Sequence, residues 1–188
     1  MTLQSCRDSA LRRLSYRLQS DHSSVPAGDV AAVARAMTDA VSSALQVYES
    51  SAQFEALKLA FAHQCVERVR HLLEDETVAR CLDTLGDYIK GQVDRGTLDL
   101  AASEAATLAN QHQGSRSLDG VGHAAVSASY AVANALAGRA VQAADYAAYA
   151  AVYGDGGYGA VCDPESFIPE KTWQLATLEK LANAVVGR

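Results

Sequence analysis

Apolar residues recur three and four positions apart along most of the chain, and no segment shows the strict alternation typical of a strand. The most regular stretch, residues 121–153, reads VGHAAVSASYAVANALAGRAVQAADYAAYAAVY and consists mainly of small residues. Alanine favours helix, and a glycine just past a helix end accepts a left-handed backbone. The stretch therefore predicts two helices that are broken at Ala137 and Gly138.

Each helix of this alanine-rich pair has one face that we expect to be buried. On the first helix the face consists of Val121, Ala125, Ser129, Val132 and Leu136, and on the second it consists of Val141, Ala144, Ala148 and Val152. Small side chains allow two helix axes to approach closely. We therefore expect the pair at the centre of the fold, with bulkier helices around it.

The same spacing predicts six further helices, at about residues 3–18, 29–49, 52–74, 78–90, 97–112 and from 169 to near the C-terminus. By contrast, residues 154–169 (GDGGYGAVCDPESFIP) contain four glycines and two prolines and predict an irregular loop. The expected fold class is all-α: one domain of residues 1–188, a bundle of about seven to eight helices around the alanine-rich pair. Residues 1–28 are a candidate N-terminal extension.

Composition and charge narrow the expected partners and location. The net charge of -6 disfavours nucleic acid, which calls for a basic surface. No apolar run approaches the roughly 20 residues that cross a bilayer, and the N-terminus lacks the apolar core of a secretory signal. We therefore expect a cytoplasmic protein without a membrane partner. The four cysteines, Cys6, Cys65, Cys81 and Cys162, form no CxxC pair and are expected to be reduced, with Cys65 and Cys81 buried on apolar helical faces.

The histidines and the glycine-rich segment are the candidates for a metal site or a cofactor site. His63, His71 and His123 lack the spacing of an HExxH zinc motif, so we expect no metal. The glycines of residues 154–159 precede no Lys-Ser or Lys-Thr pair, follow no predicted strand, and lack the acidic spacing of a calcium loop. The sequence thus predicts no cofactor and no catalytic set, and the glycine-rich segment remains a candidate recognition loop.

The best binding candidate is a stripe of tyrosines on the second alanine-rich helix. Tyr146, Tyr149 and Tyr153 recur at three and four positions, beside Asp145, and Asp155 and Tyr158 follow in the glycine-rich segment. Tyrosine combines apolar area with a hydrogen-bonding tip and is enriched at protein interfaces. The alternative is that these tyrosines border the alanine core.

Several segments between residues 53 and 181 carry a family resemblance: LKLAFAHQCVERVRHLLE, DYIKGQVDRGTLDLAASEA, GHAAVSASYAVANAL, AADYAAYAAVYG and EKTWQLATLEKL. With these segments the chain resembles the immunity proteins of bacterial polymorphic-toxin systems, of the Imm5 and Imm5-like kind. The resemblance implies an all-helical, non-catalytic protein that binds and neutralises a toxin domain encoded beside it.

Two other functions stay open at this point. A helical scaffold or self-assembling adaptor would form a homo-oligomer through a large apolar interface. An enzyme with an all-helical fold would need His63, His123 and a carboxylate in one deep pocket. For the immunity function, the tyrosine stripe is expected to face the toxin, since an acidic surface fits the basic cleft of a toxin that acts on nucleic acid.

Overall fold

The computed structural model describes residues 39–112 and 121–186, and this part of the chain is a bundle of helices without a β-strand, which confirms the predicted all-α class. The candidate extension 1–28, the predicted helix at 3–18 and Cys6 lie outside the described residues. A helical segment at 39–46 is followed by α3 (Phe54–Glu67), the 3₁₀ turn η1 (Arg70–Leu72), α4 (Glu76–Ile89), α5 (Arg95–Gln111), α6 (Val121–Leu136), α7 (Ala140–Val161), the 3₁₀ turn η2 (Pro164–Phe167) and α8 (Ile168–Val186).

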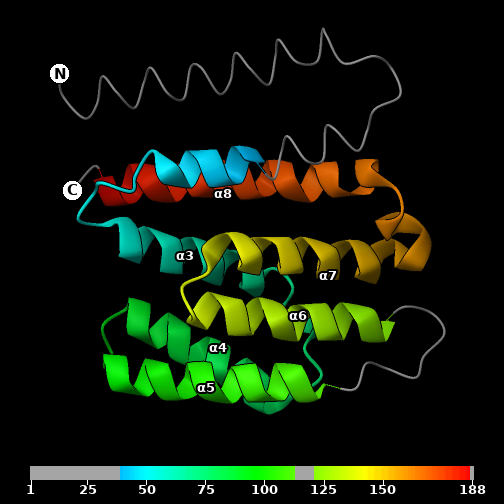
Figure 1. Cartoon of the computed structure of the whole chain (residues 1–188), viewed down its shortest axis with the longest axis horizontal. Helices are drawn as coiled ribbons and strands as arrows, with labels where there is room; N and C mark the ends of the chain where they lie inside the picture. Colours follow the sequence, from blue (N-terminus) through cyan, green and yellow to red (C-terminus); the bar gives the residue numbers. More distant parts are fainter. Residues whose placement is uncertain (1–38, 113–120, 187–188) are drawn as a thin grey trace, which may run out of the picture.

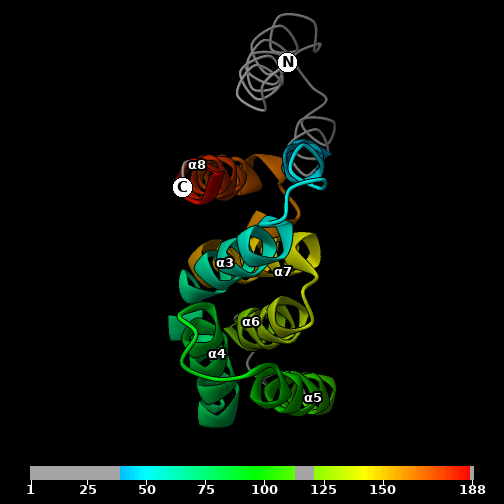
Figure 2. The same cartoon turned by 90° about the vertical axis from the view of Figure 1, so that its left-hand side faces the viewer.

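The helices form two layers with a cap. In Figures 1 and 2, α7, α6 and α5 lie side by side in one layer, and α3 and α4 lie behind them. The helical segment 39–46 and α8 cover the edge of the bundle next to α3 and α7. One core cluster of buried apolar side chains extends from Val41 to Ala182 and joins all of these elements.

The predicted break between the two alanine-rich helices is confirmed. Gly138 has a φ of 70°, in the left-handed region that favours glycine. Its N–H donates to the carbonyl of Ala135 (3.0 Å), and the N–H of Arg139 donates to the carbonyl of Asn134 (2.9 Å). These bonds close the end of α6 and turn the chain into the antiparallel α7.

The predicted buried faces of this pair are also confirmed where the structure describes them. The fully buried positions are Ala125, Ser129, Val132, Leu136, Ala144, Ala148 and Val152, while Val141 is only partly buried. The Ser129 hydroxyl donates to the carbonyl of Ala125 (3.0 Å), so its burial leaves no donor unpaired. Phe61 of α3 is fully buried behind the pair and supplies bulk that the alanines lack.

The predicted helix at 52–74 is shorter than expected. α3 ends at Glu67, and the chain continues through η1, where the N–H of Leu72 donates to the carbonyl of Val69 (3.0 Å). Val69 still reaches the core because a 3₁₀ turn tightens the chain without reversing it. The helix expected from 97 begins at Arg95, since Asp94 accepts a hydrogen bond from the N–H of Thr97 (2.9 Å) and acts as the N-cap.

The prediction of an irregular loop at 154–169 is wrong. α7 continues through this segment to Val161 with one kink at Gly157, where φ is 61° and ψ is -154°. Gly154 lies so close to η1 that a Cβ there would be 3.3 Å from Leu72 Cδ2, and a Cβ on Gly156 would be 2.6 Å from Ala160 Cβ. The glycines thus allow close packing inside a helix, although glycine costs about 1 kcal/mol per position in helix propensity.

Within the described ranges, no helix is both long enough and apolar enough to cross a membrane.

Adding volume at a buried alanine of α7 should destabilise the fold. Ala148 is completely buried, so Ala148→Leu is expected to lower the free energy of unfolding by about 1–3 kcal/mol through overpacking. Thermal unfolding followed by circular dichroism measures the change. Ala176→Leu is the matched control, because Ala176 is an exposed position inside α8. Equal midpoints for the two variants would contradict close packing around Ala148.

The burial of the cysteines predicts their reactivity. Cys65 and Cys81 are free and buried, whereas Cys162 is free and exposed. Burial raises the pKa of Cys81 to about 11 and also raises the pKa of Cys65, so neither thiol is reactive at neutral pH. Alkylation of the native protein followed by mass spectrometry should therefore modify Cys162 and spare the two buried thiols, and all three should react in denaturant.

Candidate functional site

Six aromatic side chains gather on the α6 and α7 side of the bundle. We call them the aromatic ladder, which consists of His123 and Tyr130 from α6, Tyr146, Tyr149 and Tyr153 from α7, and Phe167 from η2. The first three tyrosines after Gly138 are those that the sequence singled out. The other three members, from α6 and η2, were not assigned to the site from the sequence.

Two stacked pairs form the rungs between α6 and α7. The ring centroids of His123 and Tyr153 are 5.5 Å apart at an interplanar angle of 28°, and those of Tyr130 and Tyr146 are 5.3 Å apart at 22°. Both pairs are symmetric in sequence about Gly138. This follows from the fold, because residues equally distant from a tight break lie at the same level of an antiparallel helix pair.

Tyr149 connects the ladder to the chain that leaves α7. Its ring centroid is 6.3 Å from that of Tyr153 and 5.1 Å from that of Phe167, with interplanar angles of 37° and 60°. Asp163 caps η2 by accepting from the N–H of Glu165 (3.0 Å), which fixes the turn that carries Phe167. The ladder therefore has a defined shape from α6 to η2.

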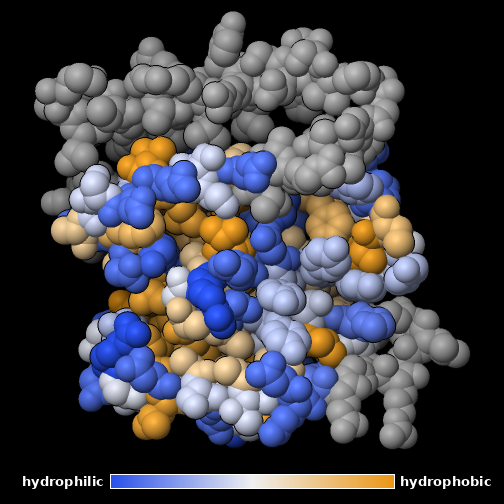
Figure 3. Space-filling model, in the orientation of Figure 1, coloured by the Kyte–Doolittle hydropathy of each residue, from blue (hydrophilic) through white to orange (hydrophobic). Residues whose placement is uncertain are grey.

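The exposed tyrosines concentrate on α7. Tyr146 is 40%, Tyr149 47% and Tyr158 71% exposed, and they are half of the large hydrophobic side chains that are exposed in the described part of the chain. Tyr153 is partly buried, and burial raises the pKa of its hydroxyl, which therefore stays protonated at neutral pH. In Figure 3, pale residues of intermediate hydropathy cover much of α6 and α7. The alanine core is thus lined by tyrosines that reach solvent.

The predicted acidic members of the site have different surroundings. Asp145 forms an ion pair with Lys171 of α8, whose side chain is buried, while the Asp145 side chain stays 39% exposed. Asp145 therefore attaches α8 to α7 in addition to bordering the ladder. Asp155 and Tyr158 lie in the C-terminal turns of α7, on either side of the kink at Gly157, and both are exposed.

A buried polar cluster lies where α3, α7 and α8 meet. Glu170 is buried and accepts from Arg68 Nε at 2.6 Å, and the Arg68 guanidinium also lies 4.6 Å from the ring centroid of Trp173. Gln174 donates from Nε2 to the carbonyl of Ala144 (2.7 Å). The Arg68 side chain stays 43% exposed while Glu170 is buried, and these contacts attach α8 to α3 and α7.

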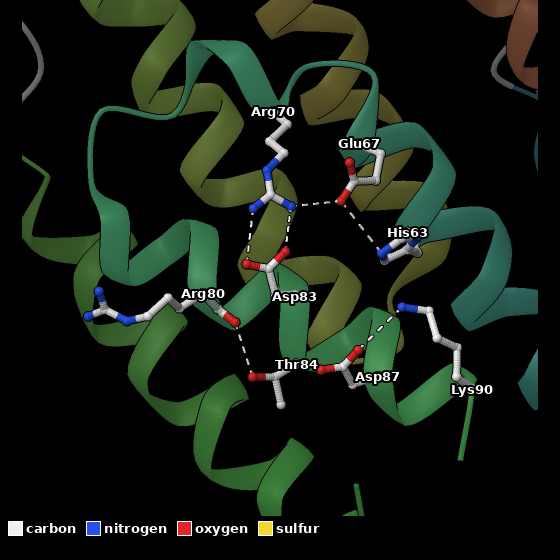
Figure 4. Close-up of polar contacts among 8 residues, drawn as sticks. All are labelled: His63, Glu67, Arg70, Arg80, Asp83, Thr84, Asp87 and Lys90. Carbon is white, nitrogen blue, oxygen red and sulfur yellow. Dashed lines mark hydrogen bonds and ion pairs between the residues drawn. The ribbon is translucent and has the colours of Figure 1, made fainter. Parts of the chain in front are cut away.

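A second polar network joins α3 to α4 (Figure 4). Arg70 makes two hydrogen bonds to Asp83, at 2.6 and 3.0 Å, and one to Glu67 at 3.1 Å. Glu67 also lies 3.7 Å from His63 Nε2. Hydrogen bonding to Arg70 lowers the pKa of Asp83. This network pins the two helices of the back layer together.

The histidines do not converge on one site. His63 packs against Gly86 of α4, where a Cβ would lie 2.9 Å from His63 Nε2, whereas His123 stacks on Tyr153 of α7. In the ranges 39–112 and 121–186, no three His, Cys, Asp or Glu side chains are arranged to hold a metal ion. His63 and His123 therefore do not share the one pocket that an enzyme was expected to need.

A shallow groove of about 390 Å³ lies elsewhere, between the helical segment 39–46, the start of α3 and the turn from α6 to α7. Its lining mixes polar or charged side chains, among them Gln46, Lys58 and Arg139, with apolar ones such as Phe54 and Val141. No member of the aromatic ladder lines it. The groove and the ladder are therefore separate features of the surface.

Comparison of the chain with known protein families, with curated proteins and with solved structures finds no match.

The α7 members of the aromatic ladder were named as site residues from the sequence, and its α6 members were not. His123, Tyr130 and Phe167 were not assigned to it, although the break predicted at Gly138 contains the information for two of them. Reflecting Tyr146 and Tyr153 about that glycine gives Tyr130 and His123. Phe167 could not be found in this way, since its position depends on η2.

The burial of His63 predicts a pH dependence of stability. Burial lowers its pKa, with Glu67 opposing the shift, so the unfolded state binds a proton more readily than the folded state. The contribution of neutral His63 to the free energy of unfolding is fully present above the pKa of the unfolded state, about 6.5. It is lost as the pH falls towards the lower pKa of His63 in the folded state. Chemical denaturation between about pH 7 and 5 should show the wild type losing stability relative to His63→Gln. His71→Gln, at an exposed position of η1, is the control. An unchanged difference between wild type and His63→Gln would contradict this.

Proposed function

We propose that this protein binds another protein through the aromatic ladder and its exposed neighbours, and that the partner is a bacterial toxin domain that it neutralises without catalysis. The observation that carries the binding proposal is the set of three exposed tyrosines, Tyr146, Tyr149 and Tyr158, on one helix of the central pair. The toxin as partner rests on the resemblance of the sequence to immunity proteins.

The packing behind the ladder supports a binding role. Tyr146 is stacked on Tyr130, and Tyr149 is held between Tyr153 and Phe167, so their rings are already ordered in the free protein. Ordering a side chain at an interface costs about 0.5–1.5 kcal/mol, and prior ordering reduces that cost. The alanines beneath are buried and closely packed, so the backbone that carries the rings is well supported.

The charge around the ladder favours a basic partner. From Ala140 to Phe167 the chain contains four carboxylates and no Lys or Arg. A toxin that acts on nucleic acid presents a basic cleft to the phosphates. An acidic surface bearing tyrosines matches such a cleft in charge and offers aromatic anchors that can be desolvated at its centre. Occupying the cleft would exclude the nucleic acid.

Substitutions on the ladder should weaken toxin binding. Tyr149→Ala and Asp155→Lys are each expected to cost at least about 1 kcal/mol of binding free energy, because one removes an aromatic anchor and the other reverses a charge. Isothermal titration calorimetry with the toxin domain encoded beside this chain measures the effect. Tyr88→Ala on α4 and Glu179→Lys on α8 are the matched controls, since both lie outside the ladder.

Two outcomes would oppose the proposal. Parental affinity in both ladder variants would remove the ladder from the interface. A stable homodimer in light scattering that Tyr149→Ala dissociates would assign the ladder to self-association and favour an adaptor.

A further inference from the structure

Five carboxylates in the back layer and in α5 form ion pairs within the protein. The ion pairs there are Glu55 with Lys58 (2.7 Å), Glu67 with Arg70 (3.1 Å), Asp83 with Arg70 (2.6 Å), Asp87 with Lys90 (3.3 Å) and Asp99 with Arg95 (2.8 Å). Such pairs cancel much of the field outside the molecule. Much of the acidity of these helices is therefore balanced internally, and Glu76 and Glu104 are the exposed carboxylates of α4 and α5 that form no ion pair with a described residue.

The carboxylates around the ladder are arranged differently. Asp145 has Lys171 as its partner, but Asp155, Asp163 and Glu165 are exposed and form no ion pair with any residue that the structure describes. The helix α6, which supplies the other side of the ladder, contains no Asp, Glu, Lys or Arg at all. The negative charge at the end of α7 and in η2 is thus not balanced by any residue that the structure describes.

Tyrosine rings on the same helix are accessible to a partner. Tyr149 contacts Tyr153 and Phe167 at tilted angles and remains 47% exposed. Tyr146 stacks on Tyr130 and remains 40% exposed. A planar cation can lie on such a ring while its edge pairs with a carboxylate.

We propose that the ladder receives arginine side chains of its partner, in preference to lysine. This rests on the proposed function in so far as the partner is a protein. A guanidinium is planar and weakly hydrated, stacks on tyrosine and pairs with a carboxylate through two parallel N–H groups. An ammonium is a compact, strongly hydrated charge that gains less from the ring. Exposed rings and unpaired carboxylates on α7 and η2 therefore both favour a guanidinium over an ammonium.

The test uses the full chain and two fluorescent peptides of equal length, an arginine homopeptide and a lysine homopeptide. Fluorescence anisotropy at moderate salt should show the arginine peptide binding at least about fivefold more tightly. Tyr149→Phe keeps the ring and should keep this preference. Tyr149→Leu keeps apolar area without the ring and should reduce it to about twofold or less. Tyr88→Leu is the control, and Asp155→Asn should weaken both peptides, the arginine peptide at least as much as the lysine peptide.

Equal affinity for the two peptides, or a preference that survives Tyr149→Leu, would overturn the inference. This result is separable from the test of the proposed function, which uses the toxin domain. If Tyr149→Ala weakens toxin binding while the peptides bind equally, the interface stands and its arginine preference does not. If the arginine preference is found but the toxin does not bind, the ladder recognises arginine on another protein.

Discussion

The close contact between α6 and α7 is the constraint on which the rest of the structure depends. Alanine at nearly every facing position brings the two helix axes together, and the left-handed backbone of Gly138 sets their register. Once this register is set, each residue on α6 has a fixed opposite residue on α7. The two stacked aromatic pairs lie at the edge of the same interface, so the core packing and the ladder have one geometric cause.

A pair of alanine-rich helices buries little area for each residue, and the surrounding elements supply what it lacks. Phe61 and Leu57 of α3 fill the space behind the pair, and Leu82 and Leu85 of α4 extend that packing. Polar contacts then fix the arrangement: Arg70 joins η1 to α4, and Asp145 joins α7 to α8. The tyrosines need not contribute to the centre of the core, which leaves their rings free to reach solvent.

Helix periodicity and the break at Gly138 were sufficient to predict the class of fold, the central pair and its buried faces. The segment 154–169 was mispredicted because its composition is typical of loops, whereas its conformation is decided by contacts with distant residues. Gly154 lies against Leu72, a contact that no local pattern contains. The C-terminal extension of α7 is therefore a case in which tertiary packing outweighs intrinsic propensity. Phe167 could not be predicted for the same reason, because its contact with Tyr149 depends on the position of η2.

The distribution of charge separates two uses of ionisable groups in this chain. On α3 to α5, most acids pair with a base on the same helix or on a neighbouring element, as Asp99 does with Arg95 and Asp83 with Arg70. On α7 and η2, Asp155 and Glu165 have no base within the same element, because the chain from Ala140 to Phe167 contains none. Salt bridges at an exposed surface contribute little to stability. A segment that omits bases therefore gives up little folding free energy and gains a field that can attract a cationic partner and speed its association.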